Sequence, residues 1–268
     1  MAIMTAATLS GRHIVVTRPT GQADSLCAAI EARGGIALRF PVLAIGEPED
    51  GRALDDVIAR LDGFDLAFFV SPNAVSHAVG PILARRAWPA GLRVATVGKG
   101  SERALAGYGF KDVIAPQSGF DSESVLALPE FGADAVAGRR VVVFRGDGGR
   151  DLLGETLRER SATVEYVTCY RRYCPAIDPA PLLRLAADGR LDAITLTSSE
   201  GVGNLRTIVG DDGWPVLRTV AIFAPHPRIV AHARAAGFEL VLETPAGDDG
   251  LLGALESHFR HASVTLRP

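Results

Sequence analysis

Short apolar, β-branched runs alternate along the chain with longer segments in which apolar residues recur at helical spacing. Helical periodicity is clear, for example, over residues 22–33 and 150–160. Such alternation predicts parallel β-sheets covered by helices on both faces. The predicted strands are residues 13–17, 37–43, 65–70, 93–97 and 112–115, followed by residues 140–144, 164–170, 192–197, 219–223 and 239–242.

The second half of this pattern repeats the first. GRHIVVTRPTGQADSL begins at Gly11, and GRRVVVFRGDGGRDLL begins 127 positions later at Gly138. Phe64 precedes the run FFVSPNAV, and Leu191, again 127 positions later, precedes TLTSSEGV. RVATVGKGSERALAGYGF likewise matches TVAIFAPHPRIVAHARAAGF at nearly the same offset. Three segments that keep almost one register predict two equivalent α/β modules.

Length and composition agree with a soluble two-domain protein. The 268 residues correspond to two domains at about 150 residues each. A hydrophobic fraction of 47% and a net charge of −3 show no footprint of nucleic-acid or membrane binding. The first ten residues lack the features of a signal peptide, and no apolar run approaches the about 20 residues of a membrane span. We therefore expect a cytoplasmic protein with neither nucleic-acid nor membrane partners.

Metal and nucleotide motifs are missing. The three cysteines form no CxxC pair, which indicates a reducing compartment without a metal or redox framework. His258 and His261 share a helical face, but no third ligand lies at a suitable spacing. The glycine-rich turns at residues 98–100 and 146–149 match neither the dinucleotide nor the phosphate-loop spacing. We expect no cofactor and no metal.

Polar residues gather where the predicted strands end. In open parallel sheets, ligands bind beyond the carboxyl ends of the strands, where helix N-termini point. For any one of these turns, helix capping alone is the favoured explanation. Six turns in symmetric positions nevertheless predict a site for carboxylates or other anions. The candidate residues are Arg18; Ser71, Pro72 and Asn73; Gly98, Lys99 and Ser101; Gly148, Gly149 and Arg150; Ser198 and Ser199; and Pro225 and His226.

The order and spacing of several short segments give the chain a family resemblance. These segments are VVTRP, SPNAV, VATVGKGSERAL, DSESVLAL, VVVFRGDGGRDLLGETL, VEYVTCYRR, TLTSSEGVGNL and AIFAPHPRIVAHARAAGF. From about Gly11 to Leu255, the chain resembles the uroporphyrinogen-III synthase family. The resemblance implies a cofactor-free lyase of haem and porphyrin biosynthesis. Such an enzyme cyclises hydroxymethylbilane to uroporphyrinogen III with loss of water and inversion of ring D.

The resemblance also implies a domain arrangement that the pattern alone leaves open. Residues 37–45 and 164–173 occupy equivalent points of the repeat and read either as internal strands or as paired connectors. The family implies connectors, with domain one formed by residues 1–43 plus 170–268 and domain two by residues 46–166. The expected fold is therefore α/β, with two similar doubly wound, flavodoxin-like parallel-sheet domains. A two-stranded β connector would join them, and the ligand cleft would lie between them.

Residue roles follow from the same resemblance. Ser71, Ser101, Ser198 and Tyr170 match positions that line the cleft, and Tyr170 is the candidate proton donor, although a packing role explains it equally well. Tyr166 is expected on the same strand face as Tyr170, because side chains alternate along a strand.

One turn departs from the family. Residues 224–227 read Ala-Pro-His-Pro where the family has glycine and a threonine-containing turn.

The implied partner is a linear tetrapyrrole, received by transient handover from hydroxymethylbilane synthase, and the protein is expected to be a monomer. The alternative is a non-enzymatic two-domain sensor that binds a small anion.

Overall fold

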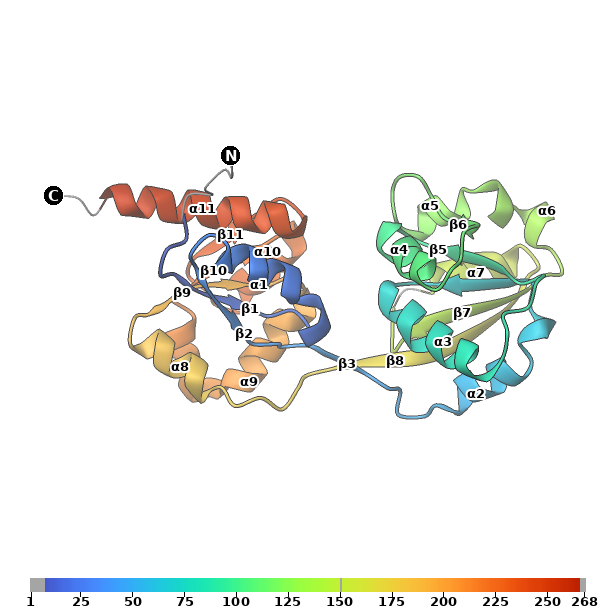
Figure 1. The fold of residues 1–268 in the computed structure, drawn as a ribbon, viewed down its shortest axis with the longest axis horizontal. Coiled ribbons are helices and arrows are strands. Elements are labelled where there is room, and N and C mark those ends of the chain that lie inside the picture. Colours follow the sequence, from blue (N-terminus) through green and yellow to red (C-terminus); the bar gives the residue numbers. More distant parts are fainter. Residues whose placement is uncertain (1–7, 150, 266–268) are drawn as a thin grey trace. The chain divides into compact units, whose positions relative to one another are not determined.

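The chain folds into two compact α/β units, which Figure 1 shows in a computed structural model. The structure describes residues 8–149 and 151–265, with side chains up to residue 260. The first unit combines the residues up to Ala44 with those from Tyr173 onward, and the second unit is Ile45–Arg172. The first unit is therefore discontinuous in sequence.

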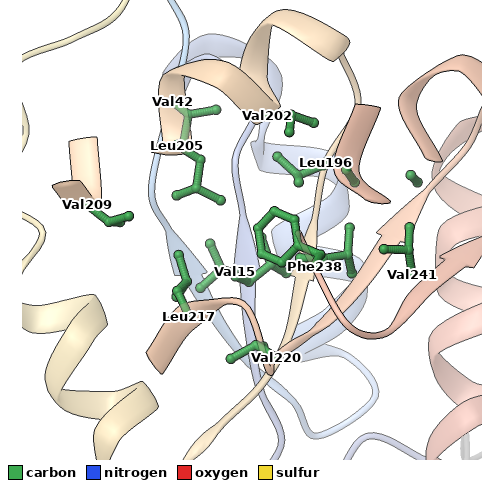
Figure 2. Packing of buried hydrophobic residues seen from close by; sticks show 14 of the residues in the cluster. Val15, Val42, Leu196, Val202, Leu205, Val209, Leu217, Val220, Phe238 and Val241 are labelled. Atoms are coloured by element: carbon green, nitrogen blue, oxygen red, sulfur yellow. The ribbon is translucent and has the colours of Figure 1, made fainter. Parts of the chain in front are cut away.

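The first unit contains a five-stranded sheet in the order β11-β10-β9-β1-β2, in which every pair is parallel. One face packs against α1 and α11, and the other against α8, α9 and α10. Figure 2 shows the second of these cores, which includes Val15, Leu196 and Leu205. The bounds are β1 His13–Val16, α1 Asp24–Glu31, β2 Ile36–Arg39, α8 Ala180–Ala187, β9 Leu191–Thr195, α9 Ser199–Leu217, β10 Ala221–Ala224, α10 Pro227–Ala235, β11 Val241–Glu243 and α11 Gly247–Thr265.

The second unit contains a six-stranded sheet in the order β3-β8-β7-β4-β5-β6. β4 to β8 pair in parallel. Helices α2, α3 and α4 cover one face, and α5, α6 and α7 cover the other. The bounds are β3 Ala44–Gly46, α2 Arg52–Ala59, β4 Leu66–Phe69, α3 Pro72–Arg85, β5 Arg93–Thr96, α4 Lys99–Gly107, β6 Val113–Ile114, α5 Ser122–Leu126, α6 Ala133–Val136, β7 Arg140–Gly146, α7 Leu152–Glu159 and β8 Thr163–Tyr173.

Each predicted strand run overlaps an observed strand, and the predicted parallel sheets are confirmed. The largest difference concerns the run over residues 37–43. The strand expected over residues 37–43 ends at Arg39, and β3 begins only at Ala44. Pro41 lies in the gap and has no backbone N–H, so it cannot donate to a ladder and interrupts the strand.

The internal repeat is preserved in hydrogen bonds at the amino ends of the strands. Asp192 accepts from Arg12 Nη1 at 2.7 Å and from the backbone N–H of His13 at 2.8 Å. In the second unit, Asp65 accepts from Arg139 Nη1 at 2.9 Å and from the N–H of Arg140 at 2.8 Å. In both units, therefore, an aspartate ties together the starts of two neighbouring strands.

A tight turn repeats in the same way. Gly11 donates to the carbonyl of Gly34 at 3.0 Å, and Gly138 donates to that of Ser161 at 2.9 Å. Gly34 has φ 81° and Ser161 has φ 65°, so both lie in the left-handed region that favours glycine. The second copy therefore holds a serine in a conformation that is strained for any residue with a side chain.

Candidate active site

Ser71 lies at the carboxyl end of β4 and starts α3. Its extended backbone, with φ −162° and ψ 164°, aims the side chain at the first turn of the helix, and Oγ accepts from the N–H of Ala74 at 3.1 Å. Pro72 follows as the first helical residue, where its missing N–H is harmless. Asn73 is the next residue of the helix. This predicted turn is therefore a helix cap, and it holds a hydroxyl in a fixed position at the carboxyl edge of the sheet.

Tyr170 meets this cap from β8. Its Oη lies 3.1 Å from Ser71 Oγ, and the residue is only 6% exposed. Its ring lies against Gly146, where an added Cβ would be 2.7 Å from Cε2 and from Cζ. The His77 ring, from α3, lies 5.8 Å from the Tyr170 ring between centroids. The structure thus brings together two predicted residues that are 99 positions apart in sequence.

The expectation that Tyr166 and Tyr170 share a strand face is wrong. Arg145 pairs with Thr168, but Gly146 pairs with Tyr170, so β8 carries one extra residue at this point. Such a β-bulge reverses the alternation beyond it. Tyr170 therefore packs with the core beneath α2 and α3, whereas Tyr166 packs with the core beneath α7.

His77 is a residue that the sequence did not single out. Its Nδ1 lies 3.6 Å from Glu47 Oε1, and its side chain is 22% exposed. The helical spacing from Ser71 places it on α3, but its proximity to Tyr170 depends on how α3 packs on β8. Only the tertiary contact identifies it.

The turn before α4 is also a helix start. Gly98 is the N-cap in an extended conformation, and Ser101 in the first turn is 2% exposed. Lys99 Nζ forms an ion pair with Glu102 Oε2 at 2.8 Å, on the same helix. The predicted lysine is therefore already paired with a carboxylate.

The loop after β7 lines a cavity of about 250 Å³. Gly148 and Gly149 have φ of 94° and 122°, which side chains rarely adopt. Arg145 pairs with Asp151 at 2.6 Å, and its Cζ lies 4.8 Å from the Tyr166 ring centroid. The predicted Arg150 lies outside the described residues.

In the first unit, three predicted residues start helices. Ser198 Oγ accepts from the N–H of Gly201 at 2.9 Å and caps α9. Within the described part of the chain, the buried Oγ of Ser199 has no hydrogen-bond partner. His226, which follows Pro225, caps α10 because its Nδ1 accepts from the N–H of Arg228 at 3.0 Å. The neutral ring must therefore carry its proton on Nε2.

Arg18 is held by the helix that follows β11. Its Nη1 lies 2.5 Å from Asp248 Oδ1, and Ser25 donates to Oδ2 of the same carboxylate at 2.6 Å. Burial by itself would raise the pKa of Asp248, but the hydrogen bonds from Ser25 and Arg18 outweigh it and keep the pKa below 3.8. Arg18 is therefore neutralised within its own unit.

The two units differ chemically at equivalent points. Ser71 corresponds to Ser198, 127 positions later, and both cap a helix. The position that corresponds to Tyr170 is Leu43, which has no hydroxyl. The pair of hydroxyls formed by Ser71 and Tyr170 thus has no counterpart at the equivalent described positions, Ser198 and Leu43, of the first unit.

Residues 8–149 and 151–260 give little support for metal-dependent or cysteine-based chemistry. No group of three or more His, Cys, Asp or Glu side chains there could hold a metal ion. Burial raises the pKa of the Cys169 thiol to about 12, so this thiol is a poor nucleophile. None of the described helices has the length and apolar character required to cross a membrane.

The fold and the strand-end turns define a class: two-unit, doubly wound α/β proteins, whose ligands bind beyond the carboxyl ends of parallel strands. A family model described as "Uroporphyrinogen-III synthase HemD" matches residues 24–252. The chain therefore belongs to the uroporphyrinogen-III synthase family, as its resemblance predicted.

Similar proteins support this assignment over nearly the whole chain. The uroporphyrinogen-III synthase of Salmonella typhimurium is 30% identical over 248 residues, which cover 91% of this chain and 99% of that protein. The Escherichia coli enzyme is 29% identical with the same coverage.

Solved structures confirm the fold. Uroporphyrinogen III synthase from Thermus thermophilus, as a triple mutant, superposes with a TM-score of 0.58 at 18% identity, covering 93% of this chain and 99% of that one. The Helicobacter pylori uroporphyrinogen-III synthetase gives a TM-score of 0.56 at 12% identity, covering 92% and 99%. The predicted two-domain α/β fold is thus confirmed.

Proposed function

We propose that this protein is a lyase that cyclises hydroxymethylbilane to uroporphyrinogen III, with loss of water and inversion of ring D. Family membership supports the reaction. The observation that carries the proposal is the contact between Tyr170 Oη and Ser71 Oγ at 3.1 Å, at the carboxyl edge of a parallel sheet. It provides a positioned proton donor, which assists the loss of a hydroxyl as water.

Tyr170 is the proposed acid. Ring A of the substrate loses its hydroxyl, which leaves as water after accepting the phenolic proton, and an electrophilic azafulvene remains. Ser71 Oγ already accepts from Ala74, so its own O–H can donate to Tyr170 Oη and stabilise the phenolate. A phenol is a weak acid, but the electron-rich pyrrole assists departure, so we expect Tyr170 to accelerate the step rather than to be indispensable.

Orientation decides the product. The substituted carbon of ring D attacks the azafulvene and forms a spiro intermediate, which fragments and recloses as the type III isomer. The free substrate closes instead to the symmetrical type I isomer. The protein must therefore hold ring D so that the substituted carbon faces the electrophile, which is a positioning effect.

The strand-end turns are the proposed carboxylate binders. The substrate carries eight carboxylates, and helix N-termini with their amides and hydroxyls favour negative charge. Ser71, Ser101 and Ser198 lie at such termini, and His226 can donate from Nε2 because Nδ1 is occupied by the helix cap. Arg18 and Lys99 are already paired with carboxylates, so we assign the main binding role to neutral donors.

The instability of the substrate bears on the proposed partner protein. Hydroxymethylbilane closes without a catalyst, so we propose a transient handover from hydroxymethylbilane synthase. We also propose that the protein works as a monomer in the cytoplasm and uses neither cofactor nor metal.

A coupled assay tests the proposal. Hydroxymethylbilane is generated enzymatically, the protein is added, and the products are oxidised and separated as type I and type III isomers. We expect the type III fraction to rise with protein concentration above that of a protein-free control. Type I product alone at every protein concentration would reject the proposal and favour the non-enzymatic sensor.

A further inference from the structure

A cavity of about 250 Å³ opens at the carboxyl edge of the second unit's sheet, on the face that carries α5 and α7. We call it the Phe120 cavity. Its lining includes aromatic and aliphatic side chains, among them Phe68, Val97, Phe120, Leu153 and Tyr166. Whole small-molecule ligands occupy pockets of about 300–1,000 Å³. The Phe120 cavity is smaller and suits one ring of a larger molecule.

Phe120 is held at the cavity in a strained conformation. Its φ is 47°, and 49% of the residue is exposed. The turn around it is fixed, because Asp121 accepts from the N–H of Ser124 at 2.8 Å and Gly119 has no room for a side chain against Ser124. This backbone region is sterically unfavourable for a residue with a bulky side chain. Such strain persists where surrounding structure enforces it, and it concentrates at functional sites.

Phe120 also lies close to a predicted site residue. An added Cβ on Gly98 would lie 3.6 Å from Phe120 Cβ, so the aromatic side chain lies beside the N-cap of α4. Gly148 and Gly149 line the same cavity. Phe120 therefore lies close to two of the strand-end turns that contain predicted site residues.

Arg145 gives the cavity a cation. Its side chain is 13% exposed, and the guanidinium lies over the Tyr166 ring. Gly149 leaves it room, because an added Cβ there would be 3.1 Å from Nη2. Its carboxylate partner Asp151 is 58% exposed, so a ligand carboxylate can take that place. Aromatic walls beside one guanidinium match a planar ring that bears a carboxylate.

We propose that the Phe120 cavity is a subsite for one pyrrole ring of the substrate. The ring packs against Phe120 and Leu153, and one of its carboxylates pairs with Arg145. This inference rests on the proposed function and adds to it a binding position on the opposite sheet face from Tyr170.

Phe120→Gly tests the subsite. Glycine suits φ 47°, so the variant removes the ring and relieves the strain together. We expect the melting temperature to stay level or rise. We also expect KM for hydroxymethylbilane to increase about tenfold, because the variant loses one aromatic contact with the substrate. The type III fraction should fall as well. Arg145→Met should raise KM similarly, and Arg145→Lys should recover part of the loss.

Ser161→Gly is the matched control. It also replaces a residue at positive φ, 65°, but it lies where β8 begins, at the opposite sheet edge. It should gain stability without any change in KM or isomer ratio. If wild-type protein forms no type III isomer, the proposed function itself fails. If the wild type is active and Phe120→Gly keeps its KM and isomer ratio, or loses only kcat together with stability, the subsite is rejected.

Discussion

Gly146→Ala is the most direct test of how Tyr170 is placed. The added Cβ would lie 2.7 Å from Tyr170 Cε2 and Cζ and 3.0 Å from Oη. Carbon atoms in contact normally lie about 3.5–4.0 Å apart, so the ring or the strand must move by about 1 Å. The ring is almost fully buried beneath α3, and it cannot move away from Gly146 without changing its contact with Ser71.

Overpacking of this kind destabilises a protein by about 1–3 kcal/mol. The midpoint of that range, about 2 kcal/mol, corresponds to a fall in melting temperature of roughly 4–8 °C for a protein of this size. The same displacement of a proton donor by about 1 Å reduces catalysis by up to about 10²-fold. We therefore expect both thermal stability and the rate of type III formation to fall.

The measurements are thermal unfolding by circular dichroism and the isomer assay. Gly203→Ala is the control, because Gly203 is exposed on α9 with nothing within 4 Å of an added Cβ. There alanine should stabilise the helix by about 0.5–1 kcal/mol and leave activity unchanged. Wild-type stability and wild-type type III formation in Gly146→Ala would refute the placement of the tyrosine ring against this glycine.

Two further predictions concern single side chains. Tyr170→Phe keeps the ring packing but removes Oη, so type III formation should slow by about 10²-fold, the lower end of the range for a positioned acid, without being abolished; an unchanged rate in the isomer assay would exclude Tyr170 as the proton donor. Asp65→Asn tests pH dependence. The backbone hydrogen bond from Arg140 and the contact with Arg139 lower the pKa of Asp65 below 3.8, so this carboxylate stabilises the fold above about pH 4, and the contribution disappears as pH falls through the lowered pKa. The urea midpoints of wild type and Asp65→Asn should therefore differ at pH 7, and the difference should shrink as the pH falls through the lowered pKa of Asp65; a constant difference would contradict the assignment.

The sequence by itself determined the class of fold and the family. Strand and helix periodicities are local properties, so their alternation predicted parallel α/β sheets, and the repeat at 127 residues predicted two equivalent modules. Capping is local as well. Ser71 and Ser198 each precede a helix, and both side chains make the cap expected of a serine at that position.

Tertiary structure decided the contacts that local patterns cannot encode. The extra residue in β8 turned Tyr170 towards Ser71, because strand register depends on the partner strand and not on the strand's own sequence. Arg18 forms an ion pair with Asp248, which lies 230 positions away in the sequence. Phe120, in the loop after β6, and Arg145, near the carboxyl end of β7, share a cavity only because the two strands end at one sheet edge. Charge pairing and cavity shape arise from segments distant in sequence, so only the folded chain reveals them.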